Sequence, residues 1–227
     1  MIYFLLGSCL GSFLCVVAQR LPLKQDFIFS RSCCDHCRKT LRFWELIPII
    51  SGLFLCFHCK RCGKRISFIS WLVEIIYGGI FYFCCTQSST FMQFIALVWL
   101  TAATLLSLTG YFYFLVEPKI LYPLHLLLWG VMFYFHQPFY VSTFLLLVIL
   151  GIFFWFSLRD SMGMGDWLLL AFWVPWLTLE QFSLLLFVAS LSALVVFLGN
   201  YLFRKQPPQR LPFVPFLSLG LFVAYFL

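Results

Sequence analysis

The chain has 227 residues, of which 63% are hydrophobic and only 10% are charged; phenylalanine alone occurs 30 times. A soluble domain of this length does not need so much apolar surface, whereas each membrane-spanning helix needs about 20 apolar residues. The composition therefore excludes an ordinary soluble domain, and the net charge of +7 has to be interpreted relative to membrane segments.

Continuous apolar runs along the chain predict an all-α polytopic membrane protein with about eight transmembrane helices. The runs do not alternate between apolar and polar residues, which argues against membrane-spanning strands. The predicted spans are 2–19, 68–86, 91–109, 120–136, 140–157, 166–179, 182–203 and 211–227.

A basic loop follows the first span and predicts the topology. It carries ten basic residues against three acidic ones, Asp26, Asp35 and Glu45. The positive-inside rule puts this loop in the cytoplasm and the N-terminus outside. The chain is therefore expected to divide into a first transmembrane helix at 1–19, a cytoplasmic loop at 20–67 and a helical bundle at 68–227.

Two Cys-x-x-Cys pairs in this loop predict a metal site. Cys34 and Cys37 form the first pair, and Cys59 and Cys62 form the second. Each pair can present two thiolates to one ion, and two pairs complete a tetrahedral zinc site. Because structural disulfides are uncommon in the cytoplasm, zinc is the preferred interpretation.

Other uses of the thiols stay open beside zinc. Cys33, His36 and His58 lie inside or next to the pairs and are alternative ligands. A thiol oxidoreductase at the cytoplasmic face is a further reading, and it would need only one pair and no zinc.

Acidic residues within apolar segments are candidates for function, because a charge at membrane depth is costly. Asp166 is the strongest candidate, since it closes the sequence Gly163-Met164-Gly165-Asp166 at the start of a span. Glycines there allow the backbone to approach a substrate closely, and a carboxylate can activate water. The competing interpretation is a helix N-cap, for which Asp is favoured. Glu74 lies in an earlier span and is expected to pair with a basic residue or to face a polar interior.

Several segments, in order, resemble the type IV prepilin peptidases, the bacterial members of the Gly-x-Gly-Asp intramembrane aspartic proteases. Any one of them is weak, but the ordered set is specific. Cys15 stands where the family usually has Asn. The matching segments are 11–17 (Gly-Ser-Phe-Leu-Cys-Val-Val), 20–22 (Arg-Leu-Pro), the four cysteines, 45–51 (Glu-Leu-Ile-Pro-Ile-Ile-Ser), 66–67 with 73–74, and 163–166.

The resemblance implies removal of a basic leader from prepilins at the cytoplasmic face of the bacterial plasma membrane. It also implies competence pilins among the substrates, and in many members N-methylation with S-adenosylmethionine, which the sequence leaves undecided. The four cysteines would hold a structural zinc ion. Prepilin or pseudopilin precursors and the lipid bilayer are the expected partners, and nucleic acid is not one.

This chain differs from the family at the second catalytic aspartate, which is absent here. The family has that aspartate seven residues before a proline, at the end of an earlier span. Here Tyr111 stands seven residues before Pro118, with Gly110 as the alternative position. Tyrosine, with a reference pKa of about 10, cannot take the acid or base role near neutral pH. The chain as written is expected to cleave little or nothing.

Three explanations stay open. The aspartate has been replaced in a variant, the protein is a naturally inactive relative, or Glu117 has become the partner of Asp166. The last is the weakest, because Glu117 lies six residues, nearly two helical turns, from Tyr111. The alternative class is a non-enzymatic pseudo-peptidase or assembly factor that binds pilin helices.

Overall fold

The fold is that of a computed structural model, which describes residues 1–26, 32–34, 37, 40–55, 57–86, 90–157, 163–204 and 211–226. Within these residues the regular elements are helices, and pairing between extended segments is limited to two isolated bridges, Cys33 with Thr40 and His58 with Arg65. The all-α prediction is confirmed.

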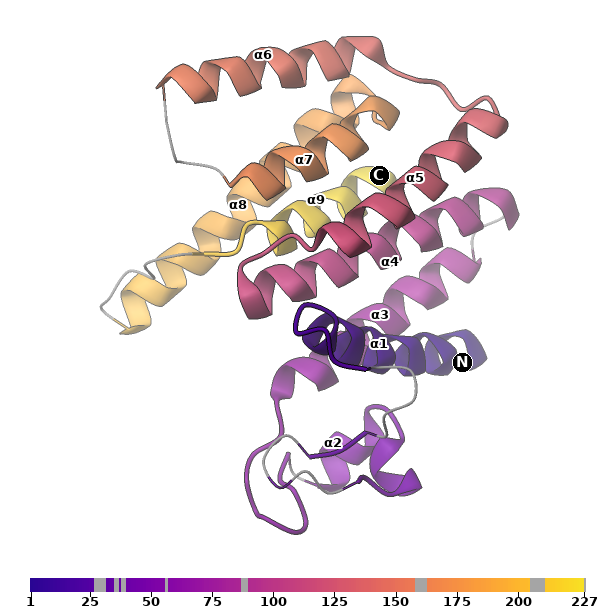
Figure 1. The fold of residues 1–227 in the computed structure, drawn as a ribbon, viewed down its shortest axis with the longest axis vertical. Coiled ribbons are helices and arrows are strands. Elements are labelled where there is room, and N and C mark those ends of the chain that lie inside the picture. The colour runs from indigo at the N-terminus through magenta and orange to yellow at the C-terminus, as the bar shows by residue number, and fades with distance from the viewer. Residues whose placement is uncertain are drawn as a thin grey trace. The chain divides into compact units, whose positions relative to one another are not determined.

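Each of the eight predicted spans coincides with a helix (Figure 1). Short helical turns lie between the first two predicted spans and within the sixth. The elements are α1 (Ile2–Arg20), η1 (Phe43–Leu46), α2 (Ile50–Phe54), α3 (Phe68–Thr86), α4 (Thr90–Tyr113), α5 (Pro118–Tyr134), α6 (Val141–Ser157), α7 (Met164–Trp173), η2 (Val174–Trp176), α8 (Leu179–Arg204) and α9 (Val214–Phe226).

Four segments of the described chain are both long and apolar enough to cross a membrane: Ile2–Arg20, Phe68–Thr86, Gln93–Tyr113 and Leu179–Leu202. Val141–Phe156 and Val214–Phe226 are apolar but shorter. The predicted span 166–179 is a shorter helix than expected. It ends at Trp173 and continues as a 3-10 turn, because Pro175 cannot donate a backbone hydrogen bond to the preceding turn.

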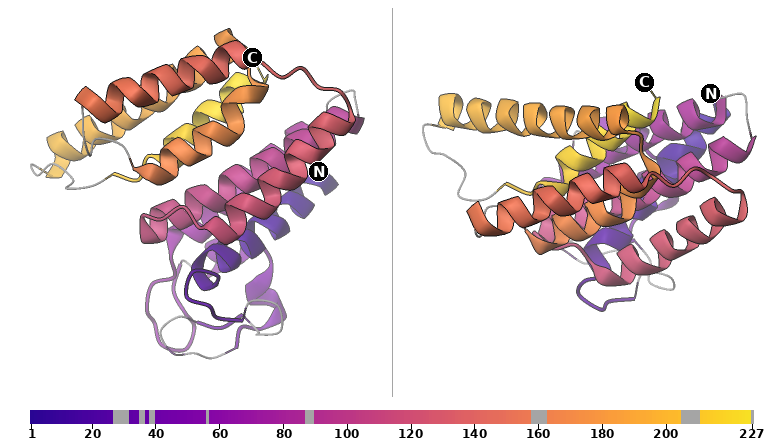
Figure 2. Two further views of the ribbon diagram at one scale, coloured as in Figure 1. Left: turned by 45° about the horizontal axis from the view of Figure 1, so that its top comes forward. Right: turned by 90° about the horizontal axis from the view of Figure 1, so that it is seen from above.

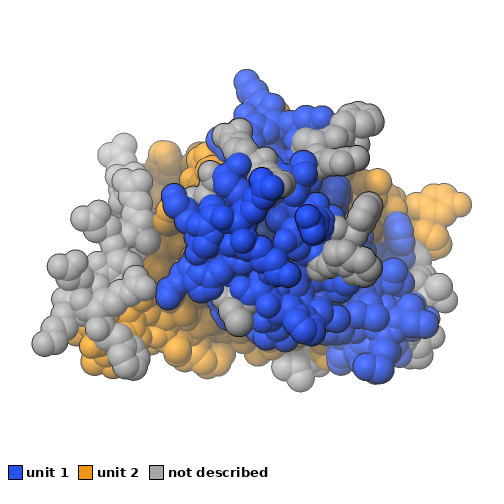
Figure 3. All heavy atoms as spheres, turned by 90° about the horizontal axis from the view of Figure 1, so that it is seen from below, with its two compact units in different colours: residues 1–97 blue, residues 98–227 orange. Residues whose placement is uncertain are grey.

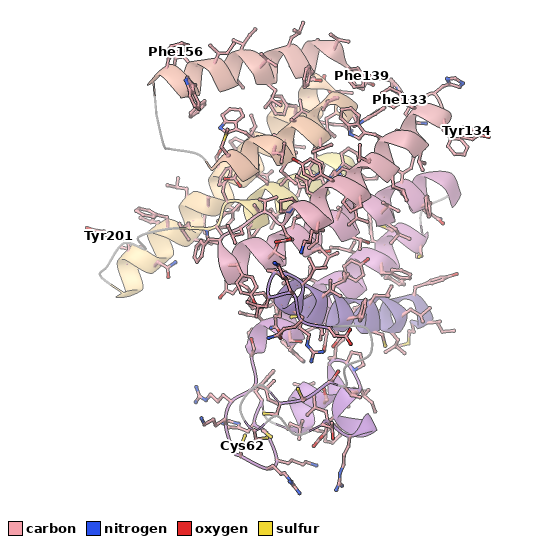
Figure 4. All side chains as sticks on the ribbon, viewed as in Figure 1. Cys62, Phe133, Tyr134, Phe139, Phe156 and Tyr201 are labelled. Carbon is pink, nitrogen blue, oxygen red and sulfur yellow. The ribbon has the colours of Figure 1, made fainter. Side chains whose placement is uncertain are left out.

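Outward-facing side chains of these helices are large and apolar, as lipid contact requires. Phe156 at the end of α6 is 82% exposed and points away from the other helices (Figure 4). Tyr201 near the end of α8 is also exposed. In water such surfaces would favour aggregation, whereas in a bilayer they need no cover.

The chain divides by packing into two units, Met1–Leu97 and Val98–Leu227, coloured separately in Figure 3. The boundary lies within α4. The predicted division at 1–19, 20–67 and 68–227 follows position relative to the membrane and stays a prediction.

In the first unit, small residues bring α1 and α3 close together. A methyl group built on Gly7 would lie 2.9 Å from the Cα of Gly78, and one built on Gly11 would lie 3.0 Å from the backbone oxygen of Val73. Small residues four positions apart allow helix backbones to approach in a membrane. The Gly-Ser-Phe-Leu segment that begins at Gly11 is therefore part of a helix–helix contact.

In the second unit, buried and half-buried polar side chains link the helices. The Trp173 indole N–H donates to Nε2 of His125 at 2.7 Å, which joins α7 to α5. Ser107 and Ser218 join α4 to α9 through hydroxyl oxygens 2.6 Å apart. Both views of Figure 2 show α9 lying alongside α8. Hydrogen bonds between helices favour one arrangement when the surroundings are apolar.

Candidate functional site

The Gly-x-Gly-Asp segment forms the first turn of α7. Gly163 is the N-cap, with extended backbone, and Asp166 is the third helical residue, so Asp166 is not the N-cap. The Asp166 N–H donates to the Gly163 carbonyl at 3.0 Å. A methyl group built on Gly163 would lie 3.3 Å from the Asp166 Oδ2. The carboxylate therefore folds back over Gly163, where a larger residue would crowd it.

Gly165 contacts the connection between α4 and α5. A methyl group built on Gly165 would lie 2.6 Å from Cγ2 and 2.9 Å from Cβ of Val116. Real Cβ contacts at 2.6 Å essentially do not occur, so only glycine fits without a shift of this connection. The first turn of α7 is thus packed against the residues that precede Glu117 and Pro118.

Tyr111 and Gly110, the two expected positions of the missing aspartate, lie in the last turn of α4 and differ in surroundings. Tyr111 is 49% exposed and packs edge-on against Phe112, with ring centroids 5.6 Å apart. A methyl group built on Gly110 would lie 3.2 Å from Cβ of Val214, at the start of α9. Position 110 therefore faces α9 closely, whereas position 111 has room for another side chain.

Glu117 is the N-cap residue of α5, with extended backbone, and it is half-buried. Its carbonyl accepts hydrogen bonds from Ile120 and Leu121. Through Val116, Gly165 lies against the residue next to Glu117. The connection from α4 to α5 and the Gly-x-Gly-Asp turn therefore meet at Val116.

The four predicted metal ligands form a cluster. The Sγ atoms of Cys34, Cys37, Cys59 and Cys62 all lie within 4.8 Å of one another, and those of Cys34 and Cys62 are 3.9 Å apart. Zn–S bonds of about 2.3 Å place the sulfurs of a tetrahedral site about 3.8 Å apart. The spacing and the all-sulfur donor set suit zinc, and these four residues could hold it.

Backbone turns position the second pair. The Cys59 N–H donates to the Lys64 carbonyl, and the Gly63 N–H donates to the Cys59 carbonyl, both at 2.9 Å. Gly63 has φ +66°, a left-handed conformation that glycine adopts without strain. Cys62 projects from this turn into the cluster (Figure 4). The turn aims both thiols of the pair at one point.

The cluster has an uneven affinity for protons. Hydrogen bonds from the backbone of Cys62 and Arg61 stabilise the Cys59 thiolate and lower the pKa of Cys59 to about 6, against partial burial. The Lys64 backbone N–H favours the Cys62 thiolate, but burial and the neighbouring thiols outweigh it and raise the pKa of Cys62 to about 11. Several thiolates close together repel one another, and a divalent cation would relieve this repulsion.

Two of the alternative ligands lie in the described chain but outside the metal cluster. Cys33 and His58 form the isolated bridges with Thr40 and Arg65. The third, His36, and the acidic Asp35 lie outside the described residues.

A buried contact that the sequence did not predict joins the cysteine loop to α3. Glu74 is only 7% exposed, and its Oε2 accepts a hydrogen bond from the Ile49 N–H at 2.8 Å. The Trp71 indole N–H donates to the Ile49 carbonyl at 3.1 Å. Ile49 has φ +64° and ψ −53°, a rare conformation for a β-branched residue. The only signal in the sequence was an acid within an apolar span.

Comparison with known proteins places these residues in a family context. Residues 5–88 match the model of the bacterial peptidase A24 N-terminal domain. A protein of Aeromonas hydrophila named prepilin leader peptidase/N-methyltransferase is 28% identical, with 97% of this chain and 88% of that protein aligned.

Two further relatives carry the same name and match shorter segments. The protein of Myxococcus xanthus is 44% identical over an aligned segment that covers 36% of this chain and 24% of that relative. The protein of Bacillus subtilis is 36% identical over an aligned segment that covers 53% of this chain and 49% of that relative. No solved structure matches the chain.

Proposed function

The chain is a relative of the prepilin leader peptidases, and we propose that it is a membrane-embedded aspartic peptidase of the prepilin-processing type whose cleavage chemistry is disabled as written. The observation that carries this proposal is the pairing of an intact Gly-x-Gly-Asp turn at Asp166 with a tyrosine at position 111.

The proposed chemistry requires two carboxylates that share one proton. One polarises the scissile carbonyl as an acid while the other deprotonates the attacking water. Asp166 supplies one carboxylate, and Gly163 leaves room for it. Gly165 allows the turn to pack on Val116, next to the end of α4, where the second carboxylate is expected. With Tyr111 there, Asp166 has no acid partner at that position.

We assign the second carboxylate to position 111 rather than 110. An aspartate at 110 would begin with a Cβ 3.2 Å from that of Val214, so the Val214 side chain would have to give way by a few tenths of an ångström. Position 111 is half-exposed and accepts a side chain smaller than tyrosine without such a shift.

The proposed substrates are prepilin or pseudopilin precursors, cut between a basic leader and the hydrophobic stretch that follows. The excess of basic residues in the loop supports a cytoplasmic loop and an N-terminus on the outer side of the plasma membrane. We propose a structural zinc ion at the four cysteines. Methyl transfer, which the relatives' names include, would require S-adenosylmethionine, and we assign none of the described residues to it.

Tyr111 also favours a second candidate, a non-enzymatic relative that binds pilin helices in the membrane. Such a protein would keep the bundle and the zinc site but would have no need of the acid pair. The two candidates differ in whether one substitution restores cleavage.

Cleavage of prepilins in membranes is the decisive test. Tyr111→Asp should gain cleavage, and Asp166→Asn in that background should abolish it. Gly110→Asp, which places the same carboxylate against α9, is the matched control and should not gain it. A panel of prepilins left uncut by a folded, zinc-loaded Tyr111→Asp protein would reject the disabled peptidase and favour the pilin-binding relative.

A further inference from the structure

The polar loop between α1 and α3 carries an exposed apolar surface on α2. Ile50, Leu53 and Phe54 lie at positions i, i+3 and i+4 and therefore share one face of the helix. They are 45%, 57% and 84% exposed. Leu46 and Ile47, just before α2, are exposed as well. We call Ile50, Leu53 and Phe54 the α2 apolar face.

The opposite side of α2 is held against the first turns of α3. A methyl group built on Gly52 would lie 2.7 Å from Cδ1 of Trp71 and 3.3 Å from a ring carbon of Phe57. Phe57, Phe68 and Trp71 form a cluster with ring centroids 5.2 to 5.5 Å apart. The hydrogen bonds of Glu74 and Trp71 to Ile49 secure the turn that leads into α2. The outward direction of the α2 apolar face is therefore set by specific contacts.

These contacts also set the level of α2 relative to the membrane. Trp71 is the fourth residue of α3, so it lies about 5 Å from the start of that span, at a rise of about 1.5 Å per residue. Tryptophan is enriched at this depth, where its ring meets the lipid headgroups. Because Gly52 packs on Trp71, α2 lies beside this first turn of α3.

The aromatic cluster that holds α2 includes the first residue of an exposed apolar row on α3. Phe68, Leu72 and Ile76 form an exposed row along α3 at intervals of four residues. Phe68 belongs both to this row and to the aromatic cluster that holds α2. Exposed Arg42, Lys64 and Arg65 lie on the segments that flank α2, and their charge complements anionic headgroups.

From this arrangement we propose that α2 is an interfacial helix, which lies in the headgroup region of the bilayer with Ile50, Leu53 and Phe54 among the lipid acyl chains. An apolar face beside basic side chains, held at the level of an interfacial tryptophan, is what such helices require. The α2 apolar face thus attaches the cysteine loop to the membrane surface. This inference does not depend on peptidase activity.

Photo-crosslinking in the full-length protein tests the proposal. The photoreactive residue p-benzoyl-phenylalanine replaces Phe54 in protein reconstituted in vesicles of phosphatidylethanolamine and phosphatidylglycerol, and adducts are identified by mass. Replacement of Leu72 on α3 is the positive control for lipid contact. Replacement of Lys60, an exposed residue of the second cysteine turn, is the polar control.

Lipid adducts at positions 54 and 72 but not at 60 are the expected result. Lipid adducts at 72 with none at 54 would overturn the proposal. Adducts from position 54 to another part of the chain would also overturn it, because the apolar face would then be covered within the protein. Addition of a prepilin provides a last check, since loss of the lipid adduct in favour of a prepilin adduct would make the face a substrate site instead.

Discussion

The carboxylate of Glu74, in the second turn of α3, accepts a hydrogen bond from the backbone N–H of Ile49 at 2.8 Å. Ile49 has a positive φ and a negative ψ, and the Ile50 N–H donates to the Pro48 carbonyl across it, which makes a three-residue γ-turn. Such turns are strained for a β-branched residue and persist only when their surroundings hold them. The relationship makes Glu74, together with Trp71, a link between the cysteine loop and α3.

Substitution of Glu74 should loosen the loop when the new side chain lacks an acceptor oxygen, and should leave it in place when an acceptor oxygen remains. Glu74→Gln keeps one, whereas Glu74→Leu leaves the Ile49 N–H without this partner, at a cost of about 1–3 kcal/mol. Limited proteolysis in detergent should cut the loop at 20–67 of the Leu variant faster than that of the parent, with the Gln variant close to the parent. Equal cleavage of all three proteins would show that this hydrogen bond does not hold the turn.

Gly165→Ala should disturb the Gly-x-Gly-Asp turn through Val116. The added methyl group would lie 2.6 Å from Cγ2 of Val116, and overpacking of this kind costs about 1–3 kcal/mol. In the Tyr111→Asp background we expect reduced prepilin cleavage and a lower unfolding temperature, with partial recovery on addition of Val116→Ala. Gly199→Ala, at a position with open space, is the control. Failure of Val116→Ala to restore either property would argue against the contact.

The neighbouring residues Gly78 and Gly79 should respond differently to alanine. A methyl group on Gly78 would lie 2.5 Å from the Ser8 hydroxyl oxygen and 3.1 Å from the Phe4 carbonyl, whereas one on Gly79 meets nothing within 4 Å. Gly78→Ala should therefore separate α1 from α3 at a cost of about 1–3 kcal/mol. Thermal unfolding in detergent should show a lower midpoint temperature for Gly78→Ala than for the parent. Gly79→Ala should leave the midpoint temperature unchanged. The reverse order would contradict the close approach of the two helices.

Zinc should be lost when one member of the cysteine cluster is removed. Cys62→Ser leaves three thiols, and a structural zinc site depends on all four ligands. Elemental analysis of purified protein should give about one zinc per chain for the parent and much less for Cys62→Ser, together with faster proteolysis of the loop. Cys9→Ser, an exposed cysteine on α1, should retain the metal. A parent protein that purifies without zinc, with its loop intact, would refute the metal site.

Much of the architecture could be predicted because its signals are local. A helix that crosses a bilayer must satisfy its backbone internally and must be apolar over its whole length, so each span is visible as a run of residues. The two Cys-x-x-Cys pairs were equally visible, since each pair is formed by one turn. The end of α7 at Trp173 was missed because the apolar run continues beyond Pro175 while the helix does not.

Contacts between distant segments carried no such signal. Nothing in the sequence paired Glu74 with Ile49 across 25 positions, or distinguished position 110, which faces Val214, from position 111. The composition and the local motifs alone determined an all-α membrane protein with a thiol-rich loop and a conspicuous missing aspartate. Only the tertiary structure decided which glycines make room for a neighbour and which acid holds a turn, because side chains distant in sequence become neighbours through packing, which local patterns do not record.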